Sequence, residues 1–435
     1  MKKLVTTLAT VGLLYTSFVQ AETSPVEERW WKGNTHAHSW WSDGDAPPEL
    51  VADWYKKNDY NFLVISDHNV MKQGEKWYPI DQASRRPEQI KTAYDMYLQR
   101  FGKDWVELRG ELGNREVKLK AIDDYRTLFE QAGDFIFIKG EEITSKFKKQ
   151  PIHLNGINLV APIEPVIGNS VTDTIQRNID LVSAQERHYK QPMFTHVNHP
   201  NFHYAIAPEN FFDLDHEPGD GFFEMYNGHS GVDNYGDDLH PSMERFWDIV
   251  LSKRLGERGK GLIYGVATDD SHEYTSWGLG HTNPGRGWIM VRSAYLSPNT
   301  ITSAIKQGHF YNSTGVELRT LDISEDSINL TVNNKADTDY VIEFIGTTKD
   351  ADLKGVGTTK KHSHRNNEDH DHKVVYTYSD DIGRVLKRVK GSKASYKLTG
   401  NEIYVRARVT STAIQANPYE TGDTEMAWTQ PLVAK

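Results

Sequence analysis

The stretch that decides the expected fold is Asn61-Phe-Leu-Val-Ile-Ser-Asp-His68, a short apolar run that ends in an aspartate and a histidine. Four apolar residues in succession, bounded by polar ones, are typical of a strand that is buried on both faces. A carboxylate and an imidazole directly after such a strand are two side chains that can bind a metal ion. The expected fold and the expected chemistry both start from this segment.

Similar apolar runs recur between residues 30 and 315, and helix-like stretches alternate with them. This alternation predicts an α/β fold, either a β/α barrel or a related wound sheet. The expected helices cover 48–58, 172–188, 242–258 and 297–307. The other runs, all expected to be buried parallel strands, are 134–139, 191–195, 221–226, 262–267 and 287–292.

Residues 71–133 interrupt this alternation. The segment is rich in charged and aromatic residues and is expected to be mostly helical. We interpret it as an insertion, either a cap over the functional site or a surface excursion without substrate contact.

The pattern changes after Gly315. Five segments alternate polar and apolar residues with a period of two, turn residues separate them, and no helix signal follows. Residues 316–435 are therefore predicted to form an all-β sandwich domain after a domain that covers 22–315. The five segments are 318–323, 327–332, 340–345, 373–378 and 402–409, and a histidine-rich tract, 362–372, is expected to be a surface loop between two of them.

The first 21 residues are typical of a secretory signal peptide. Lys2 and Lys3 precede an apolar stretch, and Val19-Gln20-Ala21 is a cleavage site with small residues at both ends. The apolar stretch is shorter than a membrane-spanning helix needs. We expect cleavage after Ala21 and a periplasmic or secreted protein that is not attached to a membrane.

The composition restricts the chemistry. The 435-residue chain has no cysteine, 18 histidines and a formal net charge of −10. A disulfide framework, a thiolate metal site and a cysteine nucleophile are excluded, so nitrogen and oxygen must hold any metal. An acidic chain binds a nucleic-acid backbone poorly, and we expect no nucleic-acid polymer as a partner.

Histidine and carboxylate residues recur at the ends of the predicted strands. In a β/α barrel these ends meet on one face, so residues far apart in the sequence share a site. His36 and His38 form an HxH pair whose imidazoles point to the same side of a strand, and Asp270 with His272 repeats the spacing. Each motif alone is weak, but together they predict a metal site. The motifs are His36-Ala-His38, Ser42-Asp43-Gly44, Ser66-Asp67-His68, Gly140-Glu141-Glu142, His153, His199-Pro200 and Asp270-Ser271-His272.

This ordered set resembles the signature of the PHP (polymerase and histidinol phosphatase) family over residues 30–315. The resemblance implies a distorted (β/α)7-type barrel, two or three divalent ions (zinc, manganese or iron) and hydrolysis of phosphate esters. Segments 309–315 and 427–431 resemble the closing strand and the end of the appended β-domain in exported members. The resemblance assigns His36, His38, Glu142 and Asp270 to a first ion, Glu142, His153 and His199 to a second, and Asp43, His68 and His272 to a third.

The expected function is metal-dependent hydrolysis of a small phosphorylated substrate, either a phosphomonoester or a small phosphodiester. No serine or cysteine nucleophile is indicated, so a metal-bound hydroxide is expected to attack phosphorus. Asp67 and Asp269 either orient ligand imidazoles or cap turns. Arg286 either pins a phosphate oxygen or is an ordinary turn residue.

Two other functions stay open. Amidohydrolases also begin with HxH and end with an aspartate, so one alternative is a metallohydrolase of a C–N or C–O bond. Against it, Glu142 stands where that group often has a carbamylated lysine. The other alternative is a non-catalytic exported binding protein whose β-domain carries the activity. The sequence does not specify the substrate or the oligomeric state.

Overall fold

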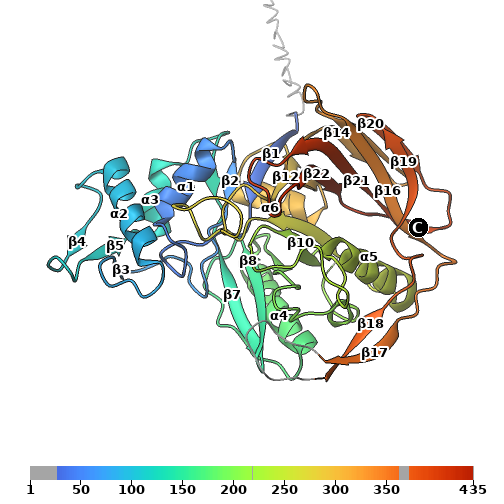
Figure 1. Ribbon diagram of the computed structural model, residues 1–435, viewed down its shortest axis with the longest axis horizontal. Helices are drawn as coiled ribbons and strands as arrows, with labels where there is room; N and C mark the ends of the chain where they lie inside the picture. Colours follow the sequence, from blue (N-terminus) through green and yellow to red (C-terminus); the bar gives the residue numbers. More distant parts are fainter. Residues whose placement is uncertain (1–26, 218, 362–371, 435) are drawn as a thin grey trace, which may run out of the picture.

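The computed structural model describes residues 27–217, 219–361 and 372–434 (Figure 1). The expected signal peptide and nearly all of the histidine-rich tract lie outside the described residues. Among the described helices, none combines the length and the apolar character that crossing a membrane requires.

Two sheets share a core in the first two thirds of the chain (Figure 1). Side chains from both sheets fill the space between them, including Phe62 and Val64 from one and Phe194 and Val266 from the other. In the first sheet β1 (Arg29–Asn34), β2 (Phe62–Leu63) and β6 (Ile136–Phe137) are parallel, and β12 (Trp288–Ser293) pairs with β1. The second sheet has the order β11 (Tyr264–Thr268), β10 (Phe222–Asn227), β9 (Phe194–Val197), β8 (Gln150–Ile157) and β7 (Gly140–Phe147).

The mixed α/β class is confirmed, but strand pairing does not close these two sheets into a barrel within the described residues. At each border between the sheets, a single bridge joins segments that follow the strands: His68 with Glu142 at one border and Ala37 with Ser271 at the other. The ends of β1, β2 and β11 and the start of β7 therefore meet where the two sheets approach each other. In place of the expected closed barrel, the described residues form an open pair of sheets. The strand ends nevertheless converge, as they would in a barrel.

The expectation that all the apolar runs form parallel strands is wrong. β12 runs antiparallel to β1, and β8 runs antiparallel to both β7 and β9. β7 and β8 are joined by only two residues, with Lys148 in the left-handed region (φ 54°). Such a short connection can join antiparallel strands only, because parallel strands need a long crossover.

The four expected helices form with small shifts at their ends: α1 (Pro48–Lys57), α4 (Val171–Tyr189), α5 (Met243–Lys253) and α6 (Pro298–Lys306). The hydroxyls of Ser170 and Ser297 accept hydrogen bonds from backbone N–H groups three residues further on, which caps α4 and α6. α5 ends earlier than expected, because Arg254–Arg258 continue as a π-helical turn, η3.

Residues 71–133 contain less helix than expected, and this expectation is corrected. α2 (Pro87–Phe101), α3 (Ile122–Tyr125) and the 3-10 turn η1 (Arg126–Leu128) accompany an antiparallel sheet of β3 (Lys76–Pro79), β5 (Glu116–Leu119) and β4 (Leu108–Arg109). In β5, buried and half-buried residues alternate with a period of two, which is the strand signal that charge and aromatic content concealed. The segment forms the lobe at the left of Figure 1.

After α6 the described chain contains strands and no helix. One sheet consists of β14 (Leu318–Ile323), β15 (Ser327–Val332) and β20 (Lys393–Lys397). The strands β19 (Arg384–Lys390), β16 (Tyr340–Thr348), β21 (Glu402–Ile414) and β22 (Thr424–Thr429) continue the first sheet of the N-terminal part through β13 (Phe310–Ser313), where Asn312 pairs with Trp428. β17 (Val356–Lys361) and β18 (His372–Thr377) form a separate hairpin, and β23 (Leu432–Val433) pairs with β21.

Candidate metal centre

All nine predicted ligands lie together where the strand ends meet. Backbone hydrogen bonds hold the two ligand segments side by side: Asp270 N donates to His36 O at 3.0 Å, and His38 N donates to Ser271 O at 2.9 Å. His68 and Glu142 are joined by the isolated bridge at the other border. Three groups of these residues have ligand atoms close enough to hold a metal ion, and they contain His36, His38 and Glu142, then His68, Glu142 and His153, then His38, Asp43, His68 and His272.

The first predicted group, which adds Asp270 to His36, His38 and Glu142, has the spacing of a four-coordinate site. Nε2 of His36 and Nε2 of His38 lie 3.1 Å apart, and Asp270 Oδ1 lies 3.2 Å and 3.3 Å from them. The two carboxylate oxygens of Glu142 lie 3.5 Å from these same two nitrogens. Metal–ligand distances of about 2.0–2.1 Å in a tetrahedron place the ligand atoms about 3.3 Å apart. The group therefore fits a first-row divalent ion.

The hydrogen-bond network indicates which nitrogen of His36 carries the proton. Nδ1 of His36 lies 2.6 Å from Oε1 of Glu224, a carboxylate that is fully buried. Because Glu224 accepts this hydrogen, the lone pair of His36 is on Nε2 and points into the first group.

The same tautomer follows for His38 from a relay of two hydrogen bonds. The hydroxyl of Ser42 donates to Asp67 Oδ1 at 2.6 Å, so it accepts from Nδ1 of His38, which lies 3.2 Å away. Nε2 of His38 then carries a lone pair that points at the same place as Nε2 of His36. Two lone pairs 3.1 Å apart repel each other unless a proton or a cation lies between them.

The third predicted group is built in the same way. Nδ1 of His272 donates to Asp270 O at 2.8 Å, which leaves its Nε2 lone pair 3.3 Å from Asp43 Oδ1. Nδ1 of His68 has Thr144 Oγ1 at 2.6 Å and Glu142 Oε2 at 2.7 Å, and its Nε2 lies 3.5 Å from Asp43 Oδ1. Asp43 Oδ1 is thus the oxygen that faces this group.

Glu142 also connects the residues predicted to form the second group. Its Oε1 lies 3.1 Å from His153 Nδ1 and 3.4 Å from His199 Nε2. Within the described part of the chain, the buried Nδ1 of His153 has no hydrogen-bond partner of acceptable geometry. A buried nitrogen aimed at a carboxylate without a hydrogen bond is what two ligands of one ion require.

The electrostatic field of the cluster favours positive charge. Burial alone would lower the pKa of His36, but Asp270, Glu224 and Glu142 raise it well above the usual value. Burial is likewise outweighed at His68, where Glu142 and Asp43 raise the pKa to about 9. At His38, burial and the neighbouring His272 lower the pKa to about 4. Positive charge concentrates near the carboxylates, which is where divalent ions would bind.

Two of the predicted ligands have strained backbone conformations. His199 has φ 29° and Asp270 has φ 47°, in a region that residues with a Cβ rarely adopt. Strain of this kind persists only where surrounding contacts maintain it, and it concentrates at functional sites. At His199 the backbone N–H donates to Glu224 Oε2 at 2.8 Å, which is one such contact.

Sequence reasoning missed Glu224, one of the residues that orient the ligands. Glu224 binds His36, and it also accepts hydrogen bonds from Thr268 Oγ1 and Asn227 Nδ2. Asn198 Nδ2 donates to Glu142 Oε1 at 2.8 Å, and Asn227 Nδ2 lies 3.1 Å from Asp270 Oδ2. The sequence offered one signal, because Glu224 is a single glutamate inside the apolar run of β10. A fully buried carboxylate needs several hydrogen-bond donors, so such a residue indicates a polar network around it.

Asp67 and Asp269 do not contact ligand imidazoles directly. Asp67 accepts from Ser39 N, Ser39 Oγ and Ser42 Oγ, so it holds the turn after β1 and reaches His38 only through Ser42. Asp269 accepts from the backbone N–H groups of Arg286 and Gly287 and from the hydroxyl of Tyr55. The capping interpretation therefore describes Asp269, and Asp67 combines a cap with an indirect positioning role.

Arg286 does not have the position that a phosphate-binding residue needs. The side chain is fully buried, and its guanidinium donates to the carbonyl oxygens of Gly228, His281 and Gly278. These bonds fold the loop between β11 and β12 onto itself and join it to the loop after β10. The expected role of Arg286 in holding a phosphate oxygen is therefore corrected, and the geometry supports the interpretation of Arg286 as a turn residue.

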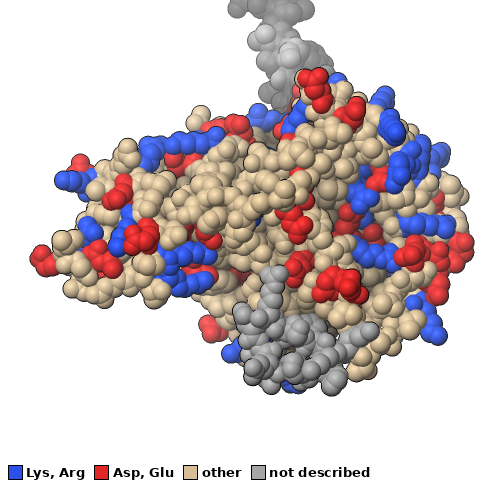
Figure 2. All heavy atoms as spheres, viewed as in Figure 1, with Lys and Arg blue, Asp and Glu red and all other residues tan. Residues whose placement is uncertain are grey.

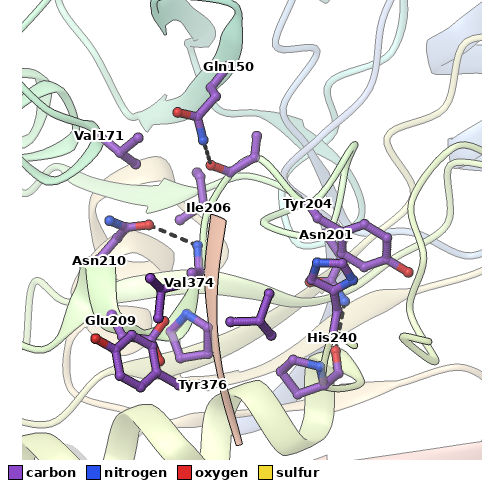
Figure 3. Close-up of a pocket in the computed structure, with 15 residues that line it drawn as sticks. Gln150, Val171, Asn201, Tyr204, Ile206, Glu209, Asn210, His240, Val374 and Tyr376 are labelled. Atoms are coloured by element: carbon purple, nitrogen blue, oxygen red, sulfur yellow. Dashed lines mark hydrogen bonds between the residues drawn. The ribbon is translucent and has the colours of Figure 1, made fainter. Parts of the chain in front are cut away.

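A separate cavity of about 300 Å³ lies between the loop that follows His199 and strand β18 (Figure 3). Tyr204 stacks on His240 at its edge, with ring centroids 3.7 Å apart, and Gln150 Nε2 donates to Ala205 O at 2.6 Å. None of the nine predicted ligands lines this cavity. It is therefore distinct from the candidate metal centre.

Comparison of the sequence with models of known protein families gives no match, and neither does comparison with curated proteins. Several chains of solved structures match this chain. One of them is a two-domain protein from Bacteroides vulgatus that contains a predicted PHP-like metal-dependent phosphoesterase, with 14% identity over 93% of this chain and 96% of that chain. The TM-score is 0.36, which is too low to assign a shared fold or function.

Proposed function

We propose that this protein is a metal-dependent phosphoesterase that hydrolyses small phosphate esters with two or three divalent ions. One observation carries the proposal: imidazole and carboxylate ligands form three adjoining groups, and Glu142, His38 and His68 each belong to two of them. In the first and third groups, hydrogen bonds on the opposite ring nitrogens direct the imidazole lone pairs inward. Adjacent cation sites that share a carboxylate are typical of enzymes that displace a group at phosphorus.

The donor set fits the proposed ions. Imidazole nitrogen and carboxylate oxygen suit zinc, manganese and iron, and the chain has no thiolate that would select otherwise. Bound divalent ions supply Lewis acidity and lower the pKa of water to about 7. The chain's own residues contribute the fixed geometry: Glu224, Ser42 and Thr144 hold the tautomers of His36, His38 and His68.

A small substrate fits the surface better than a polymer does. On the face seen in Figure 2, acidic and basic side chains are interspersed, and no extended area of one sign is visible. Nucleic-acid backbones bind to extended basic surfaces. We also propose that the protein is exported, as its first 21 residues predict, and N-terminal sequencing of the mature protein checks this.

The test combines elemental analysis with hydrolysis assays. Purified wild-type protein is expected to hold two or three divalent ions per chain and to hydrolyse 4-nitrophenyl phosphate or bis(4-nitrophenyl) phosphate. His38→Ala is expected to lose at least one ion and to lower kcat/KM about a hundredfold or more, because His38 belongs to two of the groups. His188→Ala, on the exposed end of α4, is the matched control and should match the wild type.

Three outcomes would contradict the proposal. Normal hydrolysis by His38→Ala after its ion is lost would separate the cluster from the reaction. Cleavage of a cyclic amide or lactone without cleavage of either nitrophenyl ester would favour a C–N or C–O hydrolase. Protein purified without chelator that contains no metal would favour a binding protein.

A further inference from the structure

A small cavity lies directly beside the third ligand group, at the contact between the metal centre and the insertion. Its volume is about 160 Å³, and the charged side chains that line it are Asp43, Arg85 and Arg86. Tyr78 forms part of its wall and stacks on the buried Trp40, with centroids 4.9 Å apart and ring planes 3° apart. The cavity is therefore a rigid, aromatic-sided recess with two guanidinium groups next to a predicted metal ligand.

The two oxygens of Asp43 face in different directions. Oδ1 faces His272 and His68 in the third group at 3.3 Å and 3.5 Å, and it also lies 3.5 Å from Nδ1 of His38. Oδ2 lies 3.1 Å from Nη1 of Arg85. The guanidinium of Arg85 is thus separated from the ligand group by one carboxylate and one hydrogen bond. An anion bound at that group would lie within reach of the same guanidinium.

Arg85 and Arg86 have different roles in this arrangement. Arg86 is only 24% exposed, donates to Asp43 O at 3.3 Å and lies 3.4 Å from Glu273 Oε1, so it ties the insertion to the loop after β11. Arg85 is 66% exposed, and its one ion pair among the described residues is with Asp43. A guanidinium has five N–H donors, and Arg85 uses one of them on Asp43.

We propose that Arg85 binds a phosphate oxygen of the substrate, and that the substrate class is a small phosphomonoester. This inference rests on the proposed function. A monoester presents three terminal oxygens, which can reach both the ligand group and the guanidinium, whereas a diester has one oxygen fewer and a second substituent to accommodate. The cavity is smaller than the usual 300–1,000 Å³ of ligand pockets, which also favours a small substrate. A planar, always-charged fork is suited to phosphate.

The experiment measures binding of inorganic phosphate to the metal-loaded protein by titration calorimetry, alongside metal content. Arg85→Ala is expected to weaken phosphate binding about tenfold or more, the effect of losing a charge-assisted hydrogen bond, without losing metal. Arg85→Gln serves as a second variant. The matched control is Arg100→Ala, which removes an equally charged, half-exposed arginine of the same insertion that pairs with Asp53. This control should bind phosphate as the wild type does.

The kinetic arm separates the two ester classes. Arg85→Ala should raise KM for 4-nitrophenyl phosphate about tenfold and change KM for bis(4-nitrophenyl) phosphate much less. Unchanged phosphate affinity in both Arg85 variants would overturn the inference and leave the proposed function standing. Loss of metal together with phosphate binding would make Arg85 a support for Asp43 alone, and would also overturn it. Phosphate binding that depends on Arg85 in a protein that cleaves no ester would keep Arg85 as a phosphate-binding residue, but it would refute the proposed function and the phosphomonoester class with it.

Discussion

At the scale of single residues, the candidate centre depends on side chains that fix the imidazoles. Glu224 is fully buried and accepts hydrogen bonds from His36, His199 N, Asn227 and Thr268. Burial alone would raise its pKa, but the neighbouring His36 lowers it, so the carboxylate stays charged. A charged acceptor on Nδ1 makes the opposite nitrogen of His36 a stronger ligand.

Replacing Glu224 tests this role. Glu224→Gln keeps the size of the side chain and removes its charge, so the affinity for zinc should fall about 10–100-fold while the fold is retained. Zinc affinity is measured by competition with a chromophoric chelator at fixed pH. Glu49→Gln is the control, because Glu49 is equally buried and binds Tyr97 and Trp105 away from the centre. Equal zinc affinity in wild type and Glu224→Gln would refute the positioning role.

At the scale of elements, the turn after α5 is stabilised by one arginine. Arg254 is buried in the π-helical turn η3 and donates to the carbonyl oxygens of Phe211, Leu214 and Gly261. Its Nη2 also donates to Nε2 of His216 at 2.7 Å. Burial and the charge of Arg254 lower the pKa of His216 to about 4, so this imidazole is neutral in the folded protein.

This arrangement predicts a pH dependence of stability. Between about pH 6.5 and pH 4 the unfolded chain binds a proton at His216 and the folded chain does not, so the free energy of unfolding falls as the pH falls through this window. His216 should contribute about 1–3 kcal/mol of this loss, since the side chain is partly exposed. His216→Gln keeps an acceptor for Arg254 and should make the free energy of unfolding depend less on pH in this window. Urea unfolding at several pH values measures this free energy, and His188→Gln is the control because His188 is exposed. Identical pH profiles for the wild type and His216→Gln would contradict the prediction.

At the scale of the whole molecule, a buried charge network connects the two parts of the chain. Arg406 of β21 is fully buried and donates to Asp248 of α5 through Nε at 2.9 Å and Nη2 at 2.7 Å. Tyr404 also donates to Asp248, at 2.7 Å. Together with the ten-stranded sheet that runs through both parts, these contacts predict that the C-terminal strands and the metal-binding part unfold in one transition.

Removing the arginine tests that coupling. Arg406→Ala leaves Asp248 buried without its cation, which should lower the free energy of unfolding by about 3–5 kcal/mol. Arg388→Ala is the control, because Arg388 is 63% exposed and its pair with Glu343 should contribute about 1 kcal/mol or less. Denaturant unfolding followed by tryptophan fluorescence and circular dichroism measures both. Two separated transitions in the wild type, or equal losses in the two variants, would contradict the coupling.

Much of the site could be predicted because the order of the histidine and carboxylate motifs along the chain indicates shared ligands, whether or not the sheets close into a barrel. Strands beginning near residues 62, 222, 264 and 288 were expected from apolar runs, and histidines or carboxylates follow three of them. Glu224, which contacts His36 and the backbone N–H of His199 from β10, carried no comparable spacing signal. The β7–β8 hairpin was missed because charged residues interrupt the apolar pattern of β7, and its two-residue turn reverses the expected parallel pairing.

The sequence by itself determined the alternating α/β pattern, the strand-only C-terminal third and the nine side chains that meet at the candidate centre. The α/β pattern and the C-terminal strands follow from local periodicity, and the nine side chains follow from the order of the motifs, which resembles the PHP signature. Only the tertiary structure decided that the sheets stay open, that Arg286 holds loops, and that Arg85 of the insertion lies beside Asp43. These depend on contacts between residues far apart in the chain, which local periodicity does not encode.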